Sequence, residues 1–263
     1  MDYGSVISDS VAFTRAVLNG KWVTWFVLAI CGLALVLPGI VFDTKSLTAG
    51  GALPGDPVLL TEFAVLFIAG IILTLLVLGY VVRIYRGAAE PPAFDAWVSL
   101  FLDGVRLAIL NILWLLPACI ILLFALVAIG LDGKTPLESG HSLALIGLIL
   151  LLLGIIVFVI ALFFMTLGCV RFARTGSIRE GLRLGAISET IQAIGWGNYF
   201  FVLVIATVIF LIYLLIIALL SLIPVAGAIV IGVIVYPAAQ VFFARYVSLV
   251  YDCGVPAAPA PGQ

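Results

Sequence analysis

The chain has 263 residues, of which 65% are apolar and 10% are charged, and its mean hydropathy is +1.38. Soluble domains are roughly half apolar and a quarter charged. This composition therefore excludes an ordinary soluble protein and predicts one whose solvent is the lipid bilayer. The 12 basic residues are balanced by 13 acidic ones. Nucleic-acid binding favours clustered excess positive charge, so we expect no nucleic acid partner.

Six apolar stretches are long enough to cross a bilayer as helices, which takes about 20 residues each. They cover residues 22–42, 59–82, 107–131, 142–168, 199–222 and 225–250. The first is longer than the apolar core of a typical signal peptide, and we expect it to be an uncleaved span. More polar helices on the membrane surface are predicted over 5–19, 92–105 and 177–194, and a disordered tail over 253–263. The predicted fold is an all-α, polytopic bundle of six transmembrane helices in a single membrane domain, residues 1–252.

The basic residues predict the orientation of this bundle, because Lys and Arg resist translocation. Ten of them lie on one side of the six spans, and Lys45 and Lys134 lie on the other. Six spans place both termini on the same side. We therefore predict a multi-pass protein of the cytoplasmic membrane with both termini in the cytoplasm.

The connection between the second and third spans has the pattern of an amphipathic helix. Apolar residues recur at three- and four-residue steps over 94–106, while Asp95 and Asp103 fall on the opposite side. The pair Pro91 and Pro92 suits the start of this helix. The third span is expected to re-enter the membrane after Gly104.

The second cytoplasmic connection opens with "SIRE", residues 177–180. This is a capping-box pattern, in which the serine and glutamate side chains satisfy exposed amides at a helix start. The connection ends at "GWGNYF", residues 195–200, whose glycines permit a turn. Its aromatic residues, Trp196 and Tyr199, suit the lipid headgroup boundary.

Three related segments indicate an internal repeat. "VRIYR" at 82–86, "VRFAR" at 170–174 and "VFFAR" at 241–245 each end a span that runs toward the cytoplasm. In addition, "ISDSV" at 7–11 is echoed by "ISETI" at 187–191. The predicted unit is an inward span, an arginine, a surface helix and an outward span. It occurs twice whole and once split between the two termini.

The sequence offers little for catalysis. No span has a charge near its middle, which argues against ion-coupled pumping, and Glu62 lies at the outer end of the second span. His141 is the single histidine, so a His-based metal site or catalytic triad has no second partner. The cysteines form no CxxC pair; they are Cys31, Cys119, Cys169 and Cys253. We expect no enzyme activity, no metal and no cofactor.

Five arginines are expected at similar depth just inside the membrane. They are Arg83, Arg86, Arg171, Arg174 and Arg245. One hypothesis is that they converge on an anion such as a lipid phosphate. The alternative is that each marks a helix end and pairs with a neighbouring acid, such as Asp103 or Glu180.

The same segments carry a family resemblance. "LGYVVRIYRG", "PPAFDAWVSLFLDGVR", "RFARTGSIREGLRLG", "GWGNYF", "IPVAG" and "ARYVSLVYDCG" resemble the domain-of-unknown-function family 4013, over about residues 5–254. The family pattern usually has leucine-proline where this chain has Pro91 and Pro92. The resemblance implies a polytopic membrane protein of prokaryotes, often archaea, with cytoplasmic surface helices. It implies no established activity and brings no catalytic residues.

These observations favour a non-catalytic integral membrane protein with a structural or lipid-associated role. The alternative is a transporter or channel for a small neutral or apolar solute, with Asn111, Thr207 and Gln240 as its polar lining. An intramembrane enzyme ranks third. Membrane lipids are the expected partners. The small residues Ala228 and Gly232 predict a packing seam, either within the chain or between copies in a homo-oligomer.

Overall fold

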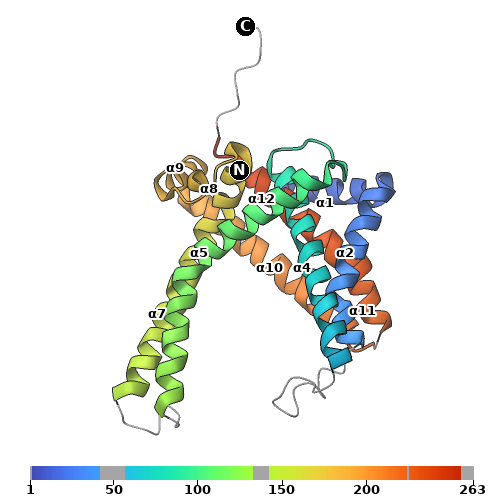
Figure 1. The fold of residues 1–263 in the computed structure, drawn as a ribbon. Helices are drawn as coiled ribbons and strands as arrows, with labels where there is room; N and C mark the ends of the chain where they lie inside the picture. The colour runs from blue at the N-terminus through green and yellow to red at the C-terminus, as the bar shows by residue number, and fades with distance from the viewer. Residues whose placement is uncertain (1, 42–56, 133–141, 224, 256–263) are drawn as a thin grey trace. The chain divides into compact units, whose positions relative to one another are not determined.

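The computed structural model describes residues 2–41, 57–132, 142–223 and 225–255. The described residues are helical almost throughout and contain no strand, which confirms the all-α prediction. Figure 1 shows the helices: α1 (Tyr3–Gly20), α2 (Trp22–Val41), α4 (Pro57–Tyr85), α5 (Trp97–Asp132), α7 (Ser142–Thr175), α8 (Ile178–Gly181), α9 (Leu184–Ile194), α10 (Trp196–Leu220), α11 (Ala226–Val230), the π-helix η1 (Ile231–Val235) and α12 (Tyr236–Asp252). Lys45, Lys134, His141 and residues 256–263 of the predicted disordered tail lie outside the described residues.

Five described helical segments are long and apolar enough to cross a membrane. They are Thr61–Tyr85, Trp97–Gly130, Leu143–Thr175, Trp196–Leu220 and Ala226–Asp252. Helices α1 and α2 meet at a bend of 99° and give a sixth span if the pair is counted as one. Large apolar side chains are exposed along these helices, Phe67, Phe124 and Ile149 among them. Apolar surfaces of this extent are stable in contact with lipid and unstable in contact with water. The chain is therefore a multi-pass helical membrane protein.

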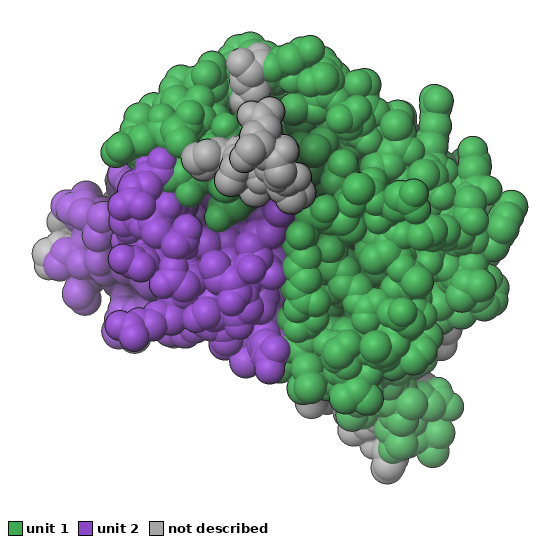
Figure 2. Space-filling view, turned by 90° about the horizontal axis from the view of Figure 1, so that it is seen from above, with its two compact units in different colours: residues 1–105, 190–263 green, residues 106–189 purple. Residues whose placement is uncertain are grey.

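The chain divides into two compact units, which Figure 2 distinguishes by colour. Unit 1 comprises residues 1–105 and 190–263, and unit 2 comprises residues 106–189. In unit 1, α1 packs against α12, α2 packs against α4 and η1, and α4 packs against α12. The N-terminal and C-terminal helices thus belong to one packed unit.

A close helix crossing in unit 1 accounts for the predicted small-residue seam. A Cβ atom placed on Gly32 of α2 would lie 2.0 Å from the carbonyl oxygen of Gly232 in η1. The two backbones approach so closely that neither position has room for a larger side chain. Gly232 is therefore used for packing within the chain.

The surface helix predicted over 92–105 is not a separate element. Helix α5 begins at Trp97 and continues without a break through Gly104 to Asp132. Gly104 does not end a helix because its role is close packing: a Cβ atom there would lie 1.8 Å from the carbonyl oxygen of Leu75 in α4. The proline pair lies before the helix, in the connection 86–96.

Unit 2 is built on a second glycine contact. A Cβ atom on Gly168 of α7 would lie 2.6 Å from the carbonyl oxygen of Gly181, which ends the single turn of α8. The indole Nε1 of Trp114 donates a hydrogen bond to the same oxygen at 3.2 Å. The single helix predicted over 177–194 is divided into α8 and α9, with Leu182 and Arg183 between them.

The last predicted span, 225–250, is also composite. It consists of α11, the π-helical turn η1 and α12, with Pro237 in the first turn of α12. A proline has no amide hydrogen for the helix ladder, and π-helical turns occur where that ladder is interrupted. The turn also brings Gly232 against α2, as described above.

Candidate functional site

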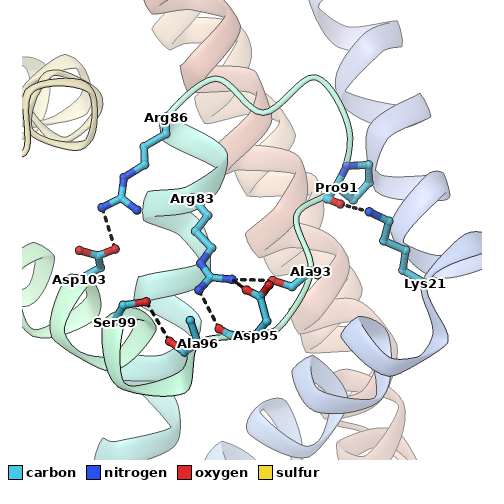
Figure 3. Close-up of polar contacts among 9 residues, drawn as sticks. All are labelled: Lys21, Arg83, Arg86, Pro91, Ala93, Asp95, Ala96, Ser99 and Asp103. Atoms are coloured by element: carbon cyan, nitrogen blue, oxygen red, sulfur yellow. Dashed lines mark hydrogen bonds and ion pairs between the residues drawn. The ribbon is translucent and has the colours of Figure 1, made fainter.

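The five predicted arginines are divided between the two units. Arg83, Arg86 and Arg245 belong to unit 1, and Arg171 and Arg174 belong to unit 2. Figure 3 shows the connection 86–96 of unit 1 in close-up, with the side chains of Arg83 and Arg86.

Arg83, in the last turn of α4, binds the end of this connection at three points. Its guanidinium donates to the carboxylate of Asp95 at 2.5 Å, to the carbonyl oxygen of Ala93 at 2.6 Å and to the carbonyl oxygen of Asp95 at 2.7 Å. The Arg83 side chain is 14% exposed, whereas that of Asp95 is 73% exposed. The acidic partner of the ion pair is thus solvated, so the pair by itself contributes little to stability.

Two more basic side chains bind carbonyl oxygens of the same connection. Lys21, between α1 and α2, donates to Pro91, and Arg245 of α12 donates to Ala88 at 2.7 Å. The Arg245 guanidinium also lies 4.9 Å from the ring centre of Phe13 in α1. We call Lys21, Arg83 and Arg245 the connection cluster.

The connection cluster has a clear physical role. Residues 86–96 form no helix or strand, and the carbonyl oxygens that the cluster binds lie before the first turn of α5. An unpaired carbonyl is most costly where water is excluded, as at the buried Pro91, and a charged donor satisfies it strongly. The cluster therefore fixes the path of the connection by binding four carbonyls, those of Ala88, Pro91, Ala93 and Asp95.

Aromatic packing and a strained residue complete the end of the connection. The ring of Phe94 stacks on that of Tyr80, with centroids 4.8 Å apart and planes 9° from parallel. Ala96 then takes a left-handed conformation with φ 45° just before α5 starts. Such backbone angles are unfavourable for alanine and persist only where surrounding contacts hold them. The Ser99 hydroxyl donates to the Ala96 carbonyl at 2.9 Å and is one such contact.

Arg86 makes the ion pair that the sequence suggested. Its guanidinium lies 2.7 Å from the Asp103 carboxylate in α5, and the side chains are 45% and 9% exposed, respectively. The buried Asp103 carboxylate is thus paired with a guanidinium that remains partly solvated.

In unit 2 the second expected pair is also present. Arg171, near the end of α7, donates to Glu180 at 2.6 Å, and Arg183 donates to the same carboxylate at 3.4 Å. The hydrogen bond from Arg171 is the main reason that the pKa of Glu180 is below its usual range. The capping box is not formed, because Ser177 is the N-cap of α8 but makes no side-chain cap bond. Arg174 is exposed.

The polar residues suggested for a transport path have local partners or lie on separate helices. The Asn111 amide oxygen accepts a hydrogen bond from the Cys169 thiol at 3.2 Å. The Thr207 hydroxyl donates to the carbonyl of Leu203, one turn earlier in α10, at 2.8 Å. Gln240 is half-buried in α12. Within the described part of the chain, no group of three or more His, Cys, Asp or Glu residues is placed to hold a metal.

Sequence reasoning found Asp103 and Glu180 but missed Lys21 and the carbonyl acceptors. The signal for the acceptors was the proline pair, since a proline-containing connection leaves carbonyls without helical partners. Lys21 is distant in sequence, and only the bend between α1 and α2 brings it to Pro91.

Comparison with known proteins identifies the family to which the chain is similar. The family model described as "Protein of unknown function (DUF4013)" matches residues 62–222. The match includes α5 to α10 and both connections described above. No curated protein and no solved structure matches the chain.

Proposed function

The chain belongs to the DUF4013 family of proteins of unknown function, and from that premise we propose that it is a non-catalytic, lipid-associated structural protein of the cytoplasmic membrane. The single observation that carries the proposal is how its basic side chains are used. They lie at the ends of lipid-exposed spans and hold two short connections together, through carbonyl oxygens in unit 1 and through Glu180 in unit 2.

This arrangement suits the headgroup layer of a membrane. Basic side chains at the ends of spans reach the polar headgroups while their stems remain beside apolar surface. Trp97 and Trp196 each start a long helix and are both 48% exposed, as expected of aromatic residues at the headgroup boundary. Both termini are proposed to lie in the cytoplasm, because Lys and Arg at these connections resist translocation.

Native mass spectrometry of the full chain, gently extracted from its own membranes, tests the proposal. We expect phospholipid adducts in fixed stoichiometry that survive mild activation. A protein that arrives without lipid under conditions that preserve lipid on a control membrane protein would contradict a lipid-associated role. Solute flux in proteoliposomes, absent from empty vesicles, would instead favour a transporter.

A further inference from the structure

The segment that joins α7 to α9 contains a cluster of positive charge that its own acid does not neutralise. Residues 171–183 include four arginines and one acidic residue, Glu180. The Glu180 carboxylate is already used, since it accepts hydrogen bonds from Arg171 and Arg183. Within the segment, four guanidinium groups thus face a single carboxylate.

Two of these arginines border the same hollow. The hollow has a volume of about 650 Å³, and the described residues that line it are Arg179, Glu180, Leu182 and Arg183. Arg179 is exposed, and its side chain has no hydrogen bond or ion pair with another described residue. The Arg183 side chain is 66% exposed, and its contact with Glu180 is long. Both guanidinium groups therefore retain donors for a ligand in the hollow.

The backbone that carries these arginines is held in place before any ligand binds. Gly181 lies between them and is buried, and its carbonyl oxygen accepts from Trp114. A Cβ atom at Gly181 would lie 3.0 Å from the carbonyl oxygen of Gly168, so α8 rests directly on α7. Arginines on a fixed turn lose less freedom on binding than arginines on a loose loop.

We propose that Arg179 and Arg183 bind a phosphate group, and that its source is the headgroup of an anionic phospholipid. A guanidinium is suited to phosphate because it offers paired donors in one plane. Arg179 and Arg183 lie shortly after Thr175, the last residue of the candidate membrane span in α7. Leu182 adds an apolar wall to the hollow, which fits the glycerol and upper acyl region of a lipid. This site rests on the proposed lipid-associated function and names its ligand class.

The test is a titration of the delipidated, detergent-solubilised full chain, followed by native mass spectrometry. The probes are dioctanoyl phosphatidylglycerol, dioctanoyl phosphatidylcholine as a zwitterionic lipid, and glycerol 1-phosphate as a soluble phosphate ester. Each arginine near anionic lipid contributes roughly a factor of five in binding. We therefore expect phosphatidylglycerol to bind about fivefold more weakly to Arg179→Ala and roughly thirtyfold more weakly to the double variant Arg179→Ala/Arg183→Ala.

Arg15→Ala is the matched control, because Arg15 is an exposed arginine of α1 in unit 1. It should bind phosphatidylglycerol as the unmodified chain does. Arg179→Ala keeps the Glu180 contacts intact, so it remains informative if the double variant fails to fold. Binding of glycerol 1-phosphate with the same dependence on Arg179 would support the phosphate site and identify a soluble ester as its ligand.

Unchanged phosphatidylglycerol binding in Arg179→Ala and in the folded double variant would overturn the site. So would equal loss in Arg15→Ala, since binding would then follow overall charge. If lipid adducts persist on the chain extracted from its membranes but phosphatidylglycerol binding does not depend on Arg179 and Arg183, the lipid-associated function stands and this site is wrong. If that extracted chain carries no lipid, the function itself is contradicted.

Discussion

Replacing Gly104 with alanine should destabilise the protein by pushing α5 away from α4. The new Cβ atom would lie 1.8 Å from the carbonyl oxygen of Leu75, whereas ordinary contacts begin near 3.4 Å, so the backbones must separate by about 1.6 Å. Because the Leu75 carbonyl oxygen is a backbone atom and cannot rotate away, we expect this clash to lower the unfolding free energy by about 3 kcal/mol, the upper end for overpacking. Alanine recovers about 1 kcal/mol through its helix propensity. The expected loss is about 2 kcal/mol.

The assay is unfolding of the detergent-solubilised protein by SDS, followed by circular dichroism. Gly70→Ala is the control, because Gly70 lies in α4, the helix that Gly104 contacts, but a Cβ atom there would meet nothing within 4 Å. That variant should be as stable as the original chain or slightly more stable. Gly79→Ala probes the same crossing, since its Cβ atom would lie 1.9 Å from the carbonyl oxygen of Leu100.

The double variant Gly79→Ala/Gly104→Ala gives a sharper result. Once the first Cβ atom has separated the helices, the second has more room, so the combined loss should be smaller than the sum of the two single losses. Equal stability of Gly104→Ala and Gly70→Ala would refute the close crossing. Strict additivity in the double variant would show that the two glycines do not share one contact.

Three further results are expected. Arg86→Ala should lower the unfolding free energy by about 1–2 kcal/mol, because Arg86 is partly solvated while its partner Asp103 is not, and Arg86→Lys should restore part of the loss in the same SDS titration. The pKa of Glu180 is lowered in the folded chain, so its contribution to stability is complete above the ordinary value of 4.5 and is lost as the pH falls through the lowered pKa. Thermal melts from pH 6 to about 3 should therefore show a loss of stability at acid pH that is absent from Glu180→Gln. Reporter fusions after Val255 and before Asp2 should both be active only as cytoplasmic reporters, and a periplasmic signal from either would contradict the proposed orientation.

Composition and the six long apolar stretches predicted the helical membrane fold, because a continuous apolar run of about 20 residues satisfies its backbone hydrogen bonds in lipid as a helix. The helix boundaries at the connections were harder to predict. Gly104 was interpreted as the point where a surface helix ends, since glycine is a poor helix former. In the structure it lies inside α5, where the contact with Leu75 requires the absence of a side chain. Which backbone a glycine meets depends on tertiary packing and cannot be read from local sequence.

In the candidate site, too, contacts between neighbours in sequence were predictable and contacts made by tertiary packing were not. The pairing of Arg86 with Asp103 was predictable, because both residues flank one connection and their charges are opposite. The use of Arg245 was not, since its acceptor is a carbonyl oxygen 157 residues away along the chain. Backbone carbonyls are present at every residue, and sequence gives no sign of which ones a distant arginine will reach.

The three related segments "VRIYR", "VRFAR" and "VFFAR" use their second position in different ways. Arg83 and Arg171 occupy the same position in the first two, and each binds an acid in the connection that follows it, 12 and 9 residues further on. A short connection keeps such an acid close, so little entropy is lost in forming the pair. The third segment lies in α12, against which α1 and α4 pack. The corresponding position is Phe242, which stacks on Tyr246 with ring centroids 6.0 Å apart. In this segment aromatic packing occupies the position of the ion pair, and Arg245 contacts the ring of Phe13 in α1.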